Sequence, residues 1–368
     1  MKILHLFNEL KFSGAEIMYV SAAPLFQKLG CKLTVANTSL QLGEYTPAFK
    51  TAGYTIIHQY IPHALLRQWK MRKELIQLIK EGGYDVVHIH RSDLRWIMSY
   101  CAWRTRCKAV YTTHSVFRSH WYSYPLHFMQ RWTAYHLFHC TFQTISDSVD
   151  ANERNYYHTQ TTLIYNWYGS TRFYPATKEE KKQTRLELNI PQDALVIISV
   201  GGCSHIKRHH DVIKAMPTIL KKYPKAIYLH LGEGNTLEEE KVLAKSLNLN
   251  QNVRFYGNQK DVRNFLIASD IYVMPSKFEG ISLTTIEAMA CNIPAILYNV
   301  PGLRDFNKEK ECALLIPEST EVLAKSIIEL YENPKQQSTL IQNGKEFVDA
   351  YFNMEKNARK IFELYTKR

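Results

Sequence analysis

Short apolar runs alternate with helix-length segments along the chain, and this alternation occurs twice. In the first half, a helix is predicted at Ala15–Leu29 and an amphipathic helix at about residues 64–80. The strands predicted around them are Lys2–Phe7, Lys32–Ala36, Val86–His90 and Ala109–Thr112. Strands that alternate with helices form parallel sheets with right-handed crossovers. The first half is therefore predicted to be one doubly wound α/β domain.

The second half begins with Ala194–Val200, a continuous β-branched run typical of a central parallel strand. The strands predicted after it are Ile227–Leu231, Val253–Phe255, Ile271–Met274 and Ala295–Tyr298. Residues 166–192 are polar and charged, so we expect a linker there, between a Rossmann-like domain at 1–165 and a second one at 193–352. The last helix, 353–368, is expected to complete the first domain. Two such domains create a ligand cleft at the carboxyl ends of their strands.

Composition narrows the setting of these domains. The 368 residues are 45% hydrophobic and 22% charged, and no apolar run approaches the ~20 residues that span a bilayer. The seven cysteines are widely spaced and include no Cys-x-x-Cys pair, so neither a disulfide framework nor a zinc site is predicted. These features favour a reduced, cytoplasmic protein.

The formal net charge is +12, and the first 160 residues carry most of it together with five of the six tryptophans. The basic and aromatic residues gather at about 64–80 and at 117–140. One interpretation is docking on an anionic membrane surface near a lipid-linked acceptor, peripherally on its inner face. The alternative is that the aromatics form the core and the cations are solvated. The charge is diffuse and no nucleic-acid motif occurs, so nucleic acid is not an expected partner.

The most informative stretch is Ile271–Pro294, with the sequence IYVMPSKFEGISLTTIEAMACNIP. A buried strand ends in Met-Pro-Ser, a loop holds Glu279 and Gly280, and a helix carrying Glu287 follows. A helix N-terminus presents unpaired N–H groups and a positive dipole end, which suits a phosphate without a metal. Two carboxylates beside such a site suit sugar hydroxyls. The alternative is that Glu287 only faces solvent.

This stretch resembles the signature of the retaining GT-B glycosyltransferases of family 4, whose Glu-x7-Glu is matched by Glu279 and Glu287. The resemblance implies that Glu279 contacts hydroxyls of the transferred sugar and that Glu287 binds the ribose. It also implies that the diphosphate region is held by the backbone amides of Gly280, Ile281, Ser282 and Leu283.

A second resemblance follows the strand that ends at Val200. The family has Val-Gly-Arg there and a lysine five residues beyond the arginine, and Lys207 matches that lysine. Gly202 replaces the arginine, which departs from the pair of cations that stabilises the leaving diphosphate. Arg208, or a basic residue of the first domain, is the expected substitute.

In the first domain, Ser13-Gly14-Ala15-Glu16 resembles the family's glycine-rich loop near the donor diphosphate, with one glycine instead of two. His114, at the end of a predicted strand, matches a histidine that touches the donor sugar. His90 is a weaker candidate of the same kind. For each histidine, a structural role in the strand end is the alternative.

The sequence as a whole predicts a retaining, metal-independent hexosyl- or N-acetylhexosaminyltransferase, with no cofactor besides its nucleoside diphosphate sugar, which we expect to be a UDP-sugar. Glu279, Lys207 and His114 are the expected catalytic residues. The acceptor is expected to be a glycan or lipid-linked hydroxyl in cell-surface polysaccharide or lipopolysaccharide synthesis. The alternatives are a catalytically silent sugar-nucleotide-binding subunit and another GT-B enzyme, such as a nucleotide-sugar epimerase.

Overall fold

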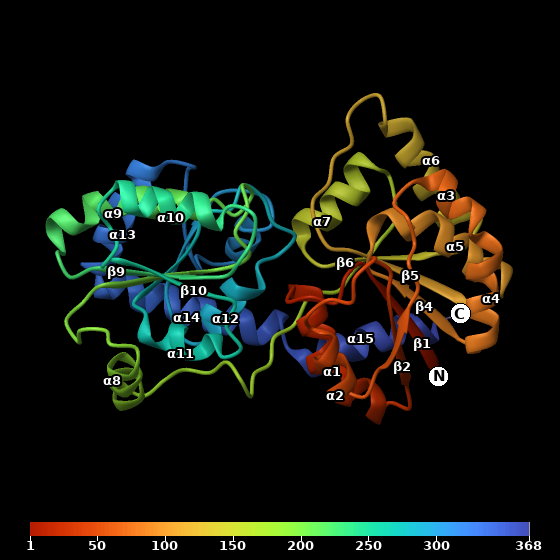
Figure 1. Ribbon diagram of the computed structural model, residues 1–368, viewed down its shortest axis with the longest axis horizontal. Coiled ribbons are helices and arrows are strands. Elements are labelled where there is room, and N and C mark those ends of the chain that lie inside the picture. Colours follow the sequence, from red (N-terminus) through yellow and green to blue (C-terminus); the bar gives the residue numbers. More distant parts are fainter. Residues whose placement is uncertain (368) are drawn as a thin grey trace. The chain divides into compact units, whose positions relative to one another are not determined.

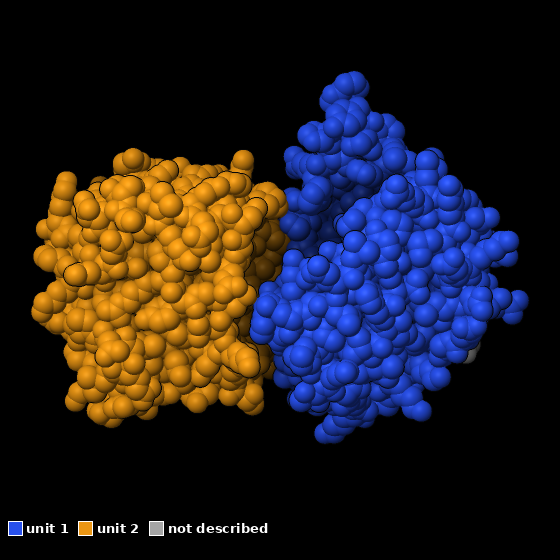
Figure 2. Space-filling view, in the orientation of Figure 1, with its two compact units in different colours: residues 1–167, 354–368 blue, residues 168–353 orange. Residues whose placement is uncertain are grey.

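A computed structural model describes residues 1–367, and its chain divides into two compact units. Unit 1 comprises residues 1–167 and 354–367, and unit 2 comprises residues 168–353 (Figure 2). Each unit holds one parallel sheet covered by helices (Figure 1). The chain therefore crosses from unit 1 to unit 2 after Trp167 and returns to unit 1 for its last helix.

Unit 1 is built on a seven-stranded sheet in the order β3-β2-β1-β4-β5-β6-β7, all of it parallel. Its strands are β1 (Lys2–Phe7), β2 (Lys32–Asn37), β3 (Thr55–His58), β4 (Val86–Ile89), β5 (Lys108–Thr113), β6 (Thr141–Thr144) and β7 (Thr162–Leu163). Its helices are α1 (Gly14–Lys28), α2 (Thr46–Thr51), α3 (Leu65–Lys70), α4 (Arg72–Gly82), η1 (Ser92–Leu94), α5 (Arg95–Arg104), α6 (Tyr124–His136), α7 (Asp147–Ala151), η2 (Asn152–Tyr156) and α15 (Met354–Thr366).

Unit 2 is built on a six-stranded parallel sheet in the order β10-β9-β8-β11-β12-β13. Its strands are β8 (Val196–Val200), β9 (Ile227–Leu231), β10 (Val253–Gly257), β11 (Ile271–Met274), β12 (Ala295–Tyr298) and β13 (Leu314–Ile316). Its helices are α8 (Lys178–Glu187), α9 (His209–Lys222), α10 (Leu237–Ser246), α11 (Val262–Ala268), α12 (Leu283–Ala290), η3 (Arg304–Asn307), α13 (Thr320–Tyr331) and α14 (Pro334–Tyr351).

The strand order reverses once in each sheet, between β1 and β4 in unit 1 and between β8 and β11 in unit 2. In open α/β sheets, ligands bind beyond the carboxyl ends of the strands at such a reversal. The strand ends that matter for function are therefore those of β1, β4, β8 and β11.

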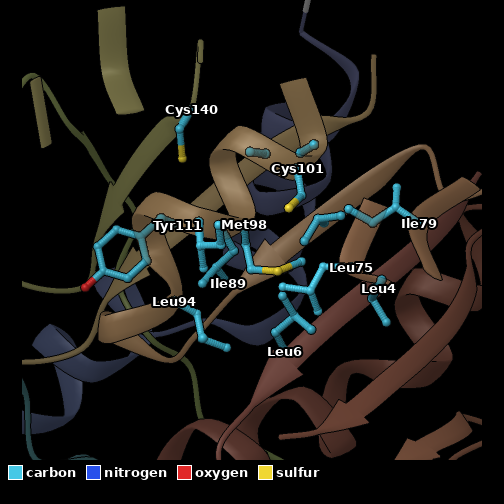
Figure 3. Packing of buried hydrophobic residues seen from close by; sticks show 14 of the residues in the cluster. Leu4, Leu6, Leu75, Ile79, Ile89, Leu94, Met98, Cys101, Tyr111 and Cys140 are labelled. Carbon is cyan, nitrogen blue, oxygen red and sulfur yellow. The ribbon is translucent and has the colours of Figure 1, made fainter. Parts of the chain in front are cut away.

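The core of unit 1 lies where α4, α5 and α6 cover one face of the sheet. Leu4 and Leu6 of β1 and Ile89 of β4 point from the sheet, and Leu75 and Met98 pack onto them from α4 and α5 (Figure 3). All five are completely buried. Burying an aliphatic side chain of this size contributes about 1.5–3 kcal/mol, so this cluster stabilises the sheet that carries the strand ends.

The structure corrects the predicted linker at residues 166–192, because most of this segment belongs to unit 2. Helix α8 packs against α11, and Nη2 of its Arg185 donates to both carboxylate oxygens of Asp270 at 2.8 Å. Glu180 of α8 pairs with Arg263 of α11 at 2.5 Å. The segment is polar because its charges serve these ion pairs.

The helix predicted at 64–80 is also different, since the structure breaks it into α3 and α4 at Met71. At this break, the ring of Trp69 packs at tilted angles against those of Trp96 and Tyr100, while Leu75 and Ile79 reach the core. The predicted strands were found, but the pattern missed β3, β6, β7 and β13. Strands β3, β6 and β7 are short and mostly polar or partly exposed, so they lack a continuous apolar run. Strand β13 is apolar, but it has only three residues.

Candidate functional site

The site of unit 2 lies at the carboxyl ends of β8 and β11, at the reversal in strand order. The loop after β8 carries Lys207, and the loop after β11 carries Glu279. The Lys207 Nζ donates a hydrogen bond to the Glu279 Oε1 over 2.6 Å, and both side chains are largely buried. Ser276 Oγ donates to the same oxygen at 2.7 Å. A cation and a carboxylate that are distant in sequence are thus held together.

The loop that bears Glu279 is fixed by close backbone packing. The Glu279 N–H donates to the Pro301 carbonyl at 3.1 Å, and Lys277 N–H donates to the Ile206 carbonyl at 2.8 Å. Gly302 has φ +81°, and a Cβ there would lie 2.2 Å from the Glu279 carbonyl oxygen. Only glycine fits at 302, so the backbone around Glu279 has little freedom to shift.

The N-terminus of α12 follows directly. Ser282 caps it by accepting a hydrogen bond from the Thr285 N–H at 3.2 Å, and Ile281 and Ser282 are buried. Gly280 and Leu283 flank this cap in the same segment. The first N–H groups of the helix, together with its positive dipole end, therefore begin four residues after Glu279, in an arrangement that suits an anion.

Glu287 projects from the second turn of α12 and is half-buried. Burial raises the pKa of its carboxyl to about 8, and the positive charge of Arg172 opposes that rise only weakly. Within residues 1–367, its carboxyl group has no hydrogen-bond partner or ion pair. A half-buried carboxyl group in this state can bind hydroxyl groups, because it accepts hydrogen bonds when ionised and both accepts and donates when protonated.

The loop before Lys207 differs from its family counterpart at Gly202. A Cβ at this position would meet the Glu233 carbonyl oxygen at 3.4 Å, which is ordinary contact, and its φ is not positive. In contrast, a Cβ at Gly232 would lie 1.9 Å from the Gly201 carbonyl oxygen. The glycine at 202 is therefore not required by space or by backbone conformation.

Arg208 lies beside Lys207 in sequence but is directed elsewhere. Its guanidinium pairs with Asp211 at 2.9 Å and with Glu318 at 2.6 Å, and it lies over the ring of Tyr298. Its backbone is left-handed, with φ 54°, at the N-cap of α9. These contacts give no support to the prediction that Arg208 supplies the cation missing at Gly202.

Unit 1 holds a chain of histidines at its own strand reversal. His5 Nδ1 lies 3.1 Å from His90 Nε2, and His90 Nδ1 lies 3.0 Å from His114 Nε2. His88 bonds the Tyr365 hydroxyl at 2.6 Å and the Thr112 hydroxyl at 2.7 Å. Burial lowers the pKa of His114 to about 4 and that of His5 to about 3, and it lowers those of His88 and His90 well below 6.5.

The orientation of this chain follows from His5. Its Nε2 is buried without a hydrogen-bond partner, and an unpaired buried lone pair is tolerated better than an unpaired buried N–H. This favours His5 Nδ1–H as donor to His90 and His90 Nδ1–H as donor to His114 Nε2. The remaining proton of His114 is then on Nδ1, where it is available as a donor.

Gly14 starts α1 and is exposed, next to the N-cap residue Ser13, whose hydroxyl bonds the carboxyl of Glu16. Burial raises the pKa of Glu16 to about 7. Sequence reasoning did not single out Glu16, Ser276 or His5. Ser276 could have been found, because it lies two residues after the end of β11 within the signature segment.

Two clusters of possible metal ligands are dense enough to hold a metal ion. One consists of His5, His88 and His90, and the other of Cys203, His230 and Glu240. In the second cluster, His230 Nε2 lies 2.8 Å from Glu240 Oε2 and 3.9 Å from Cys203 Sγ. Metal-bound histidines almost always donate their other N–H to an acceptor. The free ring nitrogens His5 Nε2 and His230 Nδ1 have none in the described structure, so both clusters fit hydrogen-bonded networks better than metal sites.

Comparison with known proteins gives matches to both halves of the chain. Residues 12–172 match the family model described as Glycosyltransferase Family 4, and residues 180–347 match the one described as Glycosyl transferases group 1. The O-antigen biosynthesis glycosyltransferase WclY of Escherichia coli is 27% identical over 64% of this chain and 66% of its own length. The putative glycosyltransferase EpsD of Bacillus subtilis is 24% identical over 80% of this chain and 79% of its own.

A GDP-mannose-dependent monoacylated alpha-(1-6)-phosphatidylinositol monomannoside mannosyltransferase of Corynebacterium glutamicum is 28% identical over 50% of each chain. The match spans 66% of the length of WclY and 50% of the length of this mannosyltransferase. Among solved structures, Anabaena HepE in complex with UDP has a TM-score of 0.83 at 18% identity and 99% coverage of both chains. WaaG, a glycosyltransferase involved in lipopolysaccharide biosynthesis, has a TM-score of 0.75 at 16% identity over 98% of this chain and 99% of its own.

These structural likenesses show the fold, which is GT-B with two Rossmann-like domains. The two family models cover most of the chain between them. The chain belongs to the GT-B glycosyltransferases of the family 4 type.

Proposed function

We propose that the protein is a retaining, metal-independent glycosyltransferase. It transfers a hexosyl or N-acetylhexosaminyl unit from a UDP-sugar to a hydroxyl of a glycan or lipid-linked acceptor. The observation that carries this proposal is the Lys207–Glu279 pair of 2.6 Å beside the N-terminus of α12. It combines a cation, a sugar-binding carboxylate and an anion-binding helix end at the reversal of one sheet.

The donor is recognised through groups of unit 2. The amides of Gly280, Ile281, Ser282 and Leu283 bind the diphosphate, and Glu287 accepts hydrogen bonds from the ribose hydroxyls. Support comes from the half-buried, unpartnered carboxylate of Glu287. Uridine as the base is supported by HepE, whose complexes contain UDP and UDP-glucose.

In the reaction, the bond between the anomeric carbon and the diphosphate oxygen breaks while the acceptor oxygen bonds to the same face of that carbon. The proton of the acceptor hydroxyl passes to the departing phosphate. Lys207 and the helix end stabilise the charge that develops on the leaving diphosphate, and Glu279 orients the sugar hydroxyls. The His114 Nδ1–H donates to a sugar oxygen. Gly14 lets the donor approach the backbone of α1 closely.

The acceptor is proposed to belong to cell-surface polysaccharide or lipopolysaccharide assembly. This follows from relatives such as the O-antigen glycosyltransferase WclY. Such acceptors are often carried on lipids, so we also propose that the protein acts at a membrane surface. No helix among residues 1–367 is long and apolar enough to cross a bilayer.

The test is a thermal-shift panel of UDP-, GDP-, ADP- and CMP-sugars, without added metal, on the wild type and Glu287→Ala. A donor at about 100 times its dissociation constant adds about 2.7 kcal/mol of stability, and thus a shift of several degrees. We expect the shift with UDP-sugars and its loss in Glu287→Ala. Glu329→Ala, which changes an exposed glutamate of α13, is the matched control and keeps the shift.

A shift with UDP-sugars that survives in Glu287→Ala would refute the ribose role of Glu287. A shift with another nucleotide alone would replace uridine as the base. A response that appears only with added magnesium would contradict metal independence.

A second candidate is a catalytically silent sugar-nucleotide-binding subunit. It is favoured by Gly202 in place of the usual arginine and by the pairing of Arg208 with Asp211 and Glu318. Turnover of the donor with added acceptor separates the two. Donor binding without turnover against any tested acceptor would establish the silent subunit.

A further inference from the structure

The outer face of α6 is unusual for a helix at a protein surface. Leu126, Met129 and Trp132 follow one another at helical spacing, and each is about half exposed. The inner face carries Arg131, which is buried and paired with Glu153 at 2.8 Å. A surface helix ordinarily buries its apolar stripe and exposes its charges, so α6 has the reverse arrangement.

The loop that leads into α6 continues this apolar surface. Trp121 is 86% exposed, and Phe117 and Tyr122 are each about two thirds exposed. At the other end of α6, Leu137 is exposed, and Trp103 of α5 packs against Phe138 with ring centroids 5.6 Å apart. The apolar face of α6 is defined here as Phe117, Trp121, Tyr122, Leu126, Met129, Trp132, Leu137 and Trp103.

In unit 2, the exposed large apolar residues are scattered over separate elements, as is normal for a globular surface: Tyr174, Leu186, Ile206 and Val242. The apolar face of α6 instead comes mostly from one loop and the helix that follows it, with Trp103 added from α5. In Figure 1, α6 and the loop before it stand out from the sheet of unit 1. An exposed patch of this kind marks an interaction surface.

The charge of the segment that carries the apolar face of α6 indicates an anionic partner. No Asp or Glu occurs between Asp93 and Asp147, whereas six basic residues do: Arg95, Arg104, Arg106, Lys108, Arg118 and Arg131. Arg104 and Arg118 are exposed beside the apolar face. The carboxylate of Glu153, which contacts α6, is completely buried and neutralised by Arg131. Residues 94–146, which supply the whole apolar face of α6, therefore carry basic side chains and no carboxylate of their own.

We propose that the apolar face of α6 docks on the surface of an anionic lipid bilayer. The tryptophans, the tyrosine and the aliphatic side chains enter the headgroup boundary, and Arg104 and Arg118 contact lipid phosphates. A second copy of the chain fits less well, because a symmetric contact would bring two carboxylate-free cationic surfaces together. This inference deepens the proposed action at a membrane by naming the surface, and it does not depend on catalysis.

The test is co-sedimentation of the full chain with vesicles of phosphatidylcholine alone and of phosphatidylcholine mixed with phosphatidylglycerol. We expect binding to the anionic vesicles that weakens with salt. A variant with Trp121→Ser, Leu126→Ser, Met129→Ser and Trp132→Ser should partition at least about tenfold less. The matched control, Leu186→Ser with Val242→Ser in unit 2, should bind like the wild type.

The changed side chains are exposed, so the fourfold variant should keep the wild-type unfolding temperature. If the fourfold variant does not fold, the test is quenching of the wild-type tryptophan fluorescence by brominated anionic lipids. We expect this quenching to be weaker in Trp121→Ser. Equal binding of both variants, or no quenching, would overturn the proposal. The proposal would also be overturned if the wild type formed a dimer that the fourfold variant lost, or if the wild type bound single-stranded DNA but not vesicles.

Failure of docking and failure of the transferase proposal are distinguishable. Donor turnover on a water-soluble acceptor should be the same in the fourfold variant and the wild type without vesicles. Vesicle binding without any turnover would leave docking intact and refute only the transferase.

Discussion

The two units share a doubly wound parallel sheet, yet they place opposite chemistry at the reversal of strand order. Unit 2 places a charged pair there, Lys207 with Glu279, and a carboxylate whose pKa is raised, Glu287. Unit 1 places neutral imidazoles there, connected from His5 through His90 to His114. The same fold thus supports an ionic site in one half and a neutral hydrogen-bonding site in the other.

The difference also concerns how each site is encoded. The unit 2 site is largely contained in one strand–loop–helix segment, so a contiguous motif reveals it. The unit 1 histidines come from β1, β4 and β5, which are distant in sequence and adjacent only in the sheet. A site of the second kind depends on the packing of the whole unit, and its stability should depend on the protonation of its histidines.

The largest expected effect is acid destabilisation of unit 1. His5, His88, His90 and His114 have folded pKa values below 6.5, so they stabilise the fold as neutral groups. The stability that they give as neutral groups is fully present above about pH 6.5, the pKa of an unfolded histidine. As the pH falls from there toward their pKa values in the folded state, the free energy of unfolding drops by up to about 1.4 kcal/mol per histidine and pH unit. Glu16, with its pKa raised to about 7, partly offsets this loss, because its protonation removes the cost of burying a charged carboxylate.

The groups that face the histidines from the packed helices are Tyr19 of α1 and Tyr365 of α15, which do not titrate in this range. All six tryptophans belong to unit 1, so tryptophan fluorescence reports its unfolding alone. The free energies of unfolding obtained from denaturant titrations at about pH 7 and about pH 5 should differ by several kcal/mol, with a lower midpoint at pH 5. His5→Phe should weaken this dependence, and His120→Phe, at an exposed position, should not. A midpoint independent of pH would contradict the prediction.

The next effect concerns the ionic site of unit 2. Lys207→Ala should lower kcat by about 10²–10³-fold, because the cation acts on charge that develops in the transition state. Arg208→Ala should change kcat by less than about tenfold and should instead lower the unfolding temperature, because Asp211 is buried and loses a partner. Steady-state kinetics and thermal unfolding of both variants check this. Abolished turnover in Arg208→Ala would assign the missing cation to that residue.

The smallest effect is a gain. Gly202→Arg should raise kcat/KM by up to about tenfold, because it adds a second cation where a side chain has room. Gly202→Gln has similar bulk without the charge and should give no gain. If both variants equal the wild type, charge compensation already exists elsewhere, and a basic residue of unit 1 becomes the first candidate.

The sequence alone determined the central strands and the strand–loop–helix segment that carries Glu279 and Glu287. Ala194–Val200 and Ile271–Met274 are buried on both faces, so their apolar runs are continuous and easy to find. Glu279 and Glu287 lie in one segment with the helix that follows. The role of each predicted site residue stays a prediction, because only binding and kinetics test it.

Only the tertiary structure decided the rest. It directed Arg208 to Asp211 and Glu318, although Arg208 is next to Lys207 in sequence. It connected His5 with His114 through His90, and it separated the exposed aromatics of α6 from the packed Trp69 and Trp96. Side-chain direction and contacts between distant strands have no signature in local periodicity. They are set by which faces the sheet and its helices bury against one another.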